Sequence, residues 1–229
     1  MAHAAAAAHS AHDTTHGHPP TSTGLDNKKV AIWAFIGSEC MLFASLISTY
    51  LIYKGRSLVG PYPHEACLPP VCSTPLKAIL NIPVTSASTF VLLMSSLAMV
   101  LALAAVEMKD QPMPQGFGAR LLRSSRLWLW MTALLGTTFL GFQAFEFTSF
   151  VHEGLTLRTN LFGSSFFTLT GFHGAHVTVG VLWLLTLLAI DYRRGLGPKD
   201  ALNVDIAALY WHFVDVVWIA IFTLVYLIK

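Results

Sequence analysis

Two ionisable residues, His212 and Asp215, lie three positions apart within an apolar run near the C-terminus, YWHFVDVVW. Two further histidines, His173 and His176, show the same spacing in TGFHGAH. Residues three positions apart share a helix face, so each pair can face one neighbouring helix. Imidazole and carboxylate groups on facing helices can bind a metal ion, relay protons or hydrogen-bond the helices together.

Two glutamates, Glu39 in GSECMLF and Glu146 in FQAFEF, also lie in apolar surroundings. A charge in a membrane span costs about 3 kcal/mol, so such groups mark a functional hypothesis. Helical zinc and di-iron sites usually carry His-Glu-x-x-His or paired Glu-x-x-His motifs, which are absent here. A proton or ion path is typical of transporters, but the hydropathy shows no inverted repeat. Hydrogen bonds between helices, each contributing about 0.6–2 kcal/mol, are the third reading, and the residues alone leave all three open.

The composition indicates a membrane protein. Of 229 residues, 54% are hydrophobic and only 11% are charged, whereas soluble proteins carry about 25% charged residues. The net charge of +2 is small, and the basic residues form no stripe, so we expect no nucleic-acid partner.

The length of the apolar runs predicts an all-α fold, a polytopic bundle of five transmembrane helices, since about 20 apolar residues cross a bilayer. The expected spans are Val30–Tyr53, Ile79–Val106, Leu127–Phe150, Leu161–Ile190 and Ile206–Ile228. The tryptophans, Trp211 and Trp218 among them, are interpreted mainly as interfacial anchors near span ends.

The charges between the spans predict the orientation. With the N-terminus inside, the inner segments hold more lysine and arginine than the outer ones, which favours a cytoplasmic N-terminus and an outer C-terminus.

Residues 1–28 are rich in histidine and are expected to form a disordered cytoplasmic tail, although a His-rich tract can also bind metal. Residues 29–229 form the membrane domain. Cys67 and Cys72, in the first outer loop, are predicted to form a disulfide rather than a metal site or two free thiols.

Long stretches of the sequence resemble subunit III of bacterial haem–copper terminal oxidases, the cytochrome c oxidase subunit 3 family, in its five-span form. YWHFVDVVW and the preceding FFTLTGFHGAHVTVG resemble the two C-terminal spans of that subunit. AIWAFIGSECMLFASLISTYLIYKGR is similar to the helix that carries a buried glutamate, and ILNIPVTSASTFVLLMSS and FQAFEF resemble the next two. The resemblance covers about residues 29–228. The chain lacks the first two helices of the seven-span form.

The resemblance implies a non-catalytic subunit of a proton-pumping respiratory oxidase in the bacterial plasma membrane. The complex, a cytochrome c oxidase or alternatively a quinol oxidase, would reduce oxygen to water, with haem and copper in partner subunits and no redox centre in this chain. The implied partners are subunit I, in direct contact, subunit II, small subunits and bound phospholipid.

The same resemblance gives the polar residues their expected roles. Glu39 matches the family's carbodiimide-reactive glutamate, His173 and His176 match its paired histidines, and His212 with Asp215 matches its terminal motif. Together with Glu146 they are candidates for a buried polar network, for the mouth of a proton-uptake path or for the lipid cleft. The alternative from another class is a stand-alone intramembrane transporter or metal-dependent enzyme.

Overall fold

The computed structural model describes residues 26–56, 61, 79–112 and 116–228. Five of its helices are long and apolar enough to cross a membrane, which confirms the predicted all-α, five-span fold. The predicted tail, up to residue 25, and the predicted Cys67–Cys72 disulfide lie outside the described residues. The elements in chain order are α1 (Asn27–Tyr53), α2 (Ile82–Glu107), the short α3 (Phe117–Leu122), α4 (Ser125–His152), α5 (Leu161–Arg194), the 3-10 turn η1 (Pro198–Asp200), α6 (Ala201–Phe222) and the π-helical turn η2 (Thr223–Leu227).

Short polar residues set where four of the long helices begin. The side chains of Asp26, Asn81, Ser124 and Asn160 each accept a hydrogen bond from a backbone N–H in the first turn of the helix that follows. Such caps satisfy donors that have no partner within the helix. The second span therefore starts at Ile82 rather than at the predicted Ile79.

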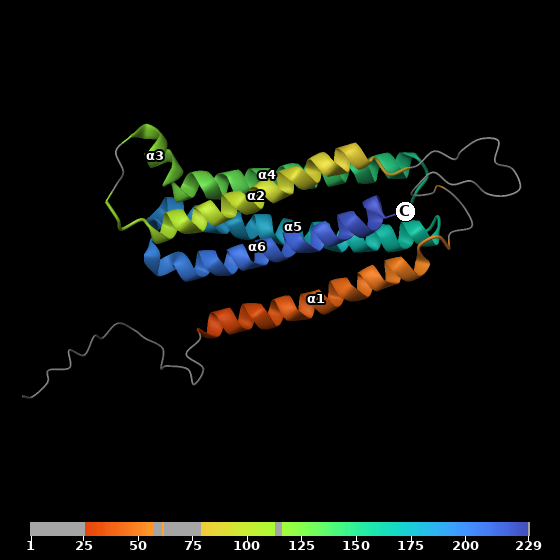
Figure 1. Ribbon diagram of the computed structural model, residues 1–229, viewed down its shortest axis with the longest axis horizontal. Helices are drawn as coiled ribbons and strands as arrows, with labels where there is room; N and C mark the ends of the chain where they lie inside the picture. The colour runs from red at the N-terminus through yellow and green to blue at the C-terminus, as the bar shows by residue number, and fades with distance from the viewer. Residues whose placement is uncertain (1–25, 57–60, 62–78, 113–115, 229) are drawn as a thin grey trace, which may run out of the picture.

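The four helices α2, α4, α5 and α6 form a compact bundle, and α1 lies along one side of it (Figure 1). The bundle contacts of α1 are made chiefly with α5 and α6. Large apolar side chains of α1 point away from the bundle, as Trp33 and Met41 show with exposed fractions of 64% and 76%. This helix is therefore the least enclosed of the five spans.

The two ends of the bundle are named here after residues in them. At the Asp191 end, α1, α4 and α6 begin and α2 and α5 finish; at the Asn160 end, α2 and α5 begin and the other spans finish (Figure 1). The longest span, α5, contains 34 residues, which corresponds to about 51 Å of helix. It is therefore longer than a bilayer core of about 30 Å and must tilt or extend beyond it.

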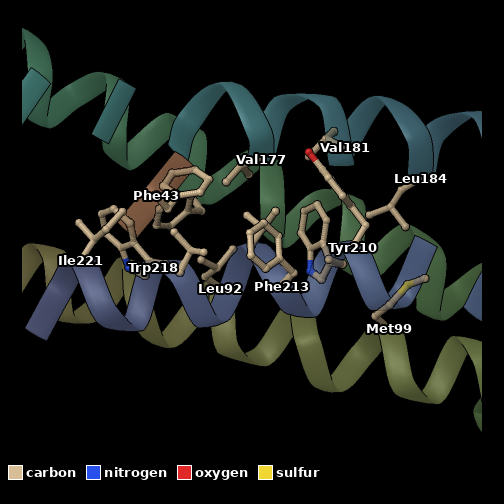
Figure 2. Close-up of a cluster of buried hydrophobic side chains, with 14 of the residues drawn as sticks. Phe43, Leu92, Met99, Val177, Val181, Leu184, Tyr210, Phe213, Trp218 and Ile221 are labelled. Atoms are coloured by element: carbon tan, nitrogen blue, oxygen red, sulfur yellow. The ribbon is translucent and has the colours of Figure 1, made fainter. Parts of the chain in front are cut away.

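Two tryptophans of α6 lie in the core of the bundle, with exposed fractions of 1% for Trp211 and 2% for Trp218. Trp218 lies among aliphatic and aromatic side chains from several helices (Figure 2). The indole Nε1 of Trp211 donates to Ser95 Oγ at 3.0 Å, and that of Trp218 donates to Thr89 Oγ1 at 2.9 Å. The prediction that these two residues are interfacial anchors is therefore wrong. They hold α6 against α2 by hydrogen bonds that satisfy their only polar group.

The ring of Trp211 fits between two glycines. A Cβ atom built on Gly136 of α4 would lie 2.5 Å from the indole, and one built on Gly180 of α5 would lie 2.8 Å from it. Real Cβ atoms do not approach other atoms so closely, so only glycine lets α4 and α5 come this near to α6. Gly136 and Gly180 thus both pack against the indole ring of Trp211.

We expect Gly180→Ala to lower the free energy of unfolding by about 1–3 kcal/mol, because the buried indole has no room to move. Gly171→Ala is the matched control on the same helix, since no described atom lies within 4 Å of its Cβ position. The control should be neutral or slightly more stable, because alanine favours helix over glycine by up to about 1 kcal/mol. Thermal unfolding of the purified protein in mild detergent measures both. Equal melting temperatures would contradict the proposed packing.

Candidate functional site

Glu39 of α1 and His176 of α5 form a polar contact between these two helices. His176 Nε2 lies 3.0 Å from Glu39 Oε2, and the two side chains are 16% and 17% exposed. His176 Nδ1 lies 2.7 Å from the carbonyl oxygen of Phe172. A carbonyl only accepts, so we assign the hydrogen to Nδ1. With the hydrogen on Nδ1, both Nε2 and an ionised Glu39 carboxylate are acceptors. The contact between Nε2 and Oε2 is therefore a hydrogen bond when one further proton lies on either of these two atoms.

Two further polar contacts attach α1 to the bundle. Near its start, Lys29 Nζ lies 2.7 Å from Asp205 Oδ2 of α6. Just after its end, Lys54 Nζ donates to the carbonyl oxygen of Ile228 at 2.6 Å, and partial burial lowers the pKa of this amine. The three contacts are spread over the full length of α1. Together they compensate for the small buried surface of this helix.

Glu146 of α4 lies in a buried cluster at the Asn160 end. Its carboxyl group accepts hydrogen bonds from Thr85 Oγ1 of α2 and from Tyr226 OH, 3.3 Å away, in η2. Glu146 is 6% exposed and also lines a cavity of about 340 Å³ together with Asn81 and Glu153. The carboxyl group therefore joins three elements and adjoins an opening at this end.

His173 lies in an apolar setting. It is fully buried, stacks on Trp218 with ring centroids 4.8 Å apart, and meets the edge of Phe139. Neither ring nitrogen has a hydrogen-bond partner among the described residues. His173 thus contacts α4 and α6 whereas His176 contacts α1, so this pair does not use the shared neighbour that its spacing allows.

His212 and Asp215 both face α2. His212 Nδ1 lies 2.5 Å from Ser96 Oγ, and the same hydroxyl lies next to the Asp215 carboxyl group. Asp215 is 3% exposed, and neither of its oxygens has a hydrogen-bond partner of good geometry in the described chain. The spacing correctly predicts a shared neighbour. The expected hydrogen-bond network is present for His212 and is not seen for Asp215.

The six candidate residues do not converge on one centre. In residues 26–56, 79–112 and 116–228, no three His, Cys, Asp or Glu side chains are grouped so that they could hold a metal ion. This contradicts the alternative reading of a metal site built from the three histidines and a carboxylate. The arrangement consists instead of separate sites, of which Glu39–His176, Glu146 and His212 form hydrogen bonds between helices.

Asp191, near the end of α5, is a polar centre that the sequence reasoning missed. It is 1% exposed and accepts hydrogen bonds from Leu196 N at 2.7 Å, Arg126 Nε at 3.3 Å and Ser125 Oγ at 3.3 Å. It therefore connects α5 to α4 and to the turn before α6. The sequence feature that could have indicated this centre is the acidic residue itself, which lies one position beyond the predicted end of the span at Ile190.

A groove of about 520 Å³ runs between α1, α5 and α6 at the Asp191 end. Its walls include Phe35, Trp183 and Ile206. Its polar lining comprises Lys28 and the ion pair of Arg194 with Asp200, whose Nη2 and Oδ1 atoms are 2.9 Å apart. The groove is therefore apolar along its walls and carries charged groups of both signs in its lining.

Comparison with known proteins gives one consistent result. The family model described as cytochrome c oxidase subunit III matches residues 8–229. Cytochrome c oxidase subunit 3 of Bacillus sp. (strain PS3) is 40% identical over 88% of this chain and 86% of the relative. Quinol oxidase subunit 3 of Bacillus subtilis is 37% identical over 86% and 85%, and cytochrome bo(3) ubiquinol oxidase subunit 3 of Pseudomonas aeruginosa is 34% identical over 95% and 92%.

Two buried carboxyl groups with different surroundings give a paired prediction. Glu146→Ala removes the acceptor of the buried Tyr226 hydroxyl and should lower the free energy of unfolding by about 1–3 kcal/mol. Asp215→Ala removes a carboxyl group that has the Ser96 hydroxyl beside it but no hydrogen bond of good geometry in the described chain, so we expect a smaller loss. Thermal unfolding of both variants in detergent measures the difference. A larger loss for Asp215→Ala would show that its carboxyl group has an essential partner.

Proposed function

The chain belongs to the cytochrome c oxidase subunit III family, and from that premise we propose that it serves as the non-catalytic third subunit of a proton-pumping respiratory oxidase. The supporting observation is the family match over residues 8–229, nearly the whole chain. Glu39 and Glu146 link helices by hydrogen bonds, and no metal-ligand cluster is found among the described residues. In this proposal the partner subunits hold the haem and copper and reduce oxygen. A stand-alone transporter or metal-dependent enzyme is not favoured by either observation.

We propose cytochrome c as the electron donor of the complex. Two relatives named cytochrome c oxidase subunit 3 are 40% and 39% identical to this chain, against 37% for a relative named quinol oxidase subunit 3. Oxygen uptake by the purified complex with reduced cytochrome c, and separately with a quinol, tests this choice.

We propose that the chain packs directly on subunit I, with subunit II and small subunits elsewhere in the complex. We also propose a plasma-membrane location with the N-terminus in the cytoplasm, which the lysine and arginine distribution favours. The Asp191 end then faces the cytoplasm. There the groove beside α1 would bind a phospholipid with its phosphate near Lys28 and Arg194.

The Glu39–His176 pair, in this proposal, supports proton uptake by fixing the position of α1 rather than by transferring protons through this chain. It links α1 to α5 about one turn from Phe35, which lines the lipid groove. Loss of the contact would loosen both the helix and the groove.

Purification of the tagged chain from its own membranes in mild detergent tests the proposed function most directly. We expect strong haem bands in the reduced-minus-oxidised optical spectrum, because the partner subunits should remain attached. The band positions would separate haem a from haem b or o types. An intact, monodisperse preparation without haem would overturn the proposal.

Glu39→Gln should leave oxygen reduction by the complex close to the wild-type rate, because the amide can still hydrogen-bond His176 and no redox group is touched. Glu39→Leu removes the contact and should reduce the amount of intact complex recovered. Oxygen uptake per haem and the ratio of this chain to the other subunits are the measurements. A loss of turnover per haem in Glu39→Gln would show that the carboxyl group takes part in proton delivery.

A further inference from the structure

A second groove, at the opposite end from the one beside α1, lies between the end of α4 and the start of α5. It has a volume of about 590 Å³ and is separate from every residue discussed above as a candidate site. Phe147 and Phe167 form its aromatic floor, with ring centroids 5.0 Å apart. Val151 and Leu157 line it with exposed fractions of 53% and 56%.

Two basic side chains lie at the surface end of this groove. Arg158 is exposed, and its guanidinium forms no hydrogen bond or ion pair with any described residue. His152, in the last turn of α4, is also exposed and lines the same groove. The described lining contains no carboxylate, and the nearby Glu153 lines the other cavity, beside Glu146. The groove therefore offers positive charge that has no acidic partner among the described residues that line it.

The loop that carries Arg158 has a well-defined structure. Gly154, with φ +88°, ends α4, and the N–H of Leu155 donates to the carbonyl of Phe150 at 2.9 Å. Thr159 Oγ1 donates to the carbonyl of Gly154 at 2.9 Å, and Ser164 Oγ donates to that of Leu157 at 2.6 Å. Leu157 and Arg158 are thus held over the groove by a folded turn, so little order has to be gained on binding.

The dimensions of the groove match the membrane boundary. Phe147 precedes His152 by little more than one helical turn, about 8 Å along the axis. The aromatic floor therefore lies at the depth of the upper acyl chain when the basic side chains lie at the level of the headgroups. Guanidinium binds phosphate through charge-assisted, often bidentate, hydrogen bonds.

We propose that this groove binds an anionic phospholipid, with its phosphate on Arg158 and His152 and one acyl chain over Phe147 and Phe167. The unpaired charge of Arg158 selects an anionic headgroup, and the apolar floor selects a lipid over a free phosphate. The site lies at the Asn160 end and is independent of the electron donor and of the groove beside α1.

The test uses the purified protein, with all subunits that accompany it, in nanodiscs of phosphatidylcholine that contain a phosphatidylglycerol with a photoactivatable acyl chain. We expect labelling within residues 147–167, competed by unlabelled phosphatidylglycerol and not by inorganic phosphate. Arg158→Gln should reduce labelling about tenfold, as expected for loss of a charged hydrogen bond. Arg158→Lys should retain most of it, because the positive charge remains.

Arg56→Gln is the matched control, since Arg56 is an exposed arginine after α1 at the same end, outside this groove. Its labelling should equal that of the wild type. The proposal is overturned if a phosphatidylcholine probe labels residues 147–167 equally well, or if Arg158→Gln labels like the control. It is also overturned if a photoreactive residue at position 157 cross-links to another subunit, because a protein then occupies the groove.

Discussion

The close approach of α6 to α4 and α5, with the indole of Trp211 between Gly136 and Gly180, is the constraint on which the bundle depends. In a bilayer the hydrophobic effect does not drive helices together, because lipid tails are as apolar as leucine. Dense packing and interhelical hydrogen bonds must hold the bundle instead. Trp211 provides both, since its ring fills the space left by the glycines and its Nε1 donates to Ser95 of α2. One side chain thus contacts three other spans.

The first span, α1, is attached to the bundle mainly by polar contacts rather than by close packing. This helix has little buried surface and depends on polar contacts near its start, at Glu39 and just after its end. Each contact contributes modestly in a membrane, by about 0.6–2 kcal/mol, so no single one should be indispensable. The groove between α1, α5 and α6 exists because these contacts hold α1 beside the bundle while leaving space between apolar side chains. A lipid in that groove would replace packing that protein atoms do not supply.

The sequence predicts the existence of the five spans well, because hydropathy summed over 20 residues exceeds what a soluble helix shows. The sequence predicts poorly which neighbouring helix each polar residue contacts. His173 and His176 are separated by about 60° around the helix axis, which is enough to aim them at different neighbours in a bundle. Asp191 was missed because hydropathy cannot show that an acidic residue at a span end is buried by a neighbouring helix and turn. The resemblance supplied the family, but only the coordinates show that the six polar residues stay apart.

His173 and Asp215 raise the question of why a bundle keeps buried polar groups that have no hydrogen bond in the described chain. Such groups lower stability unless something compensates, so packing alone does not explain them. For His173 part of the compensation is visible, since its ring stacks on Trp218 and acts as an aromatic filler between α4 and α6. Asp215 has no such ring contact in the described chain, and the polar group beside its carboxyl is the Ser96 hydroxyl. It differs in this from Glu146, whose two hydrogen-bond donors make it a structural link within the chain.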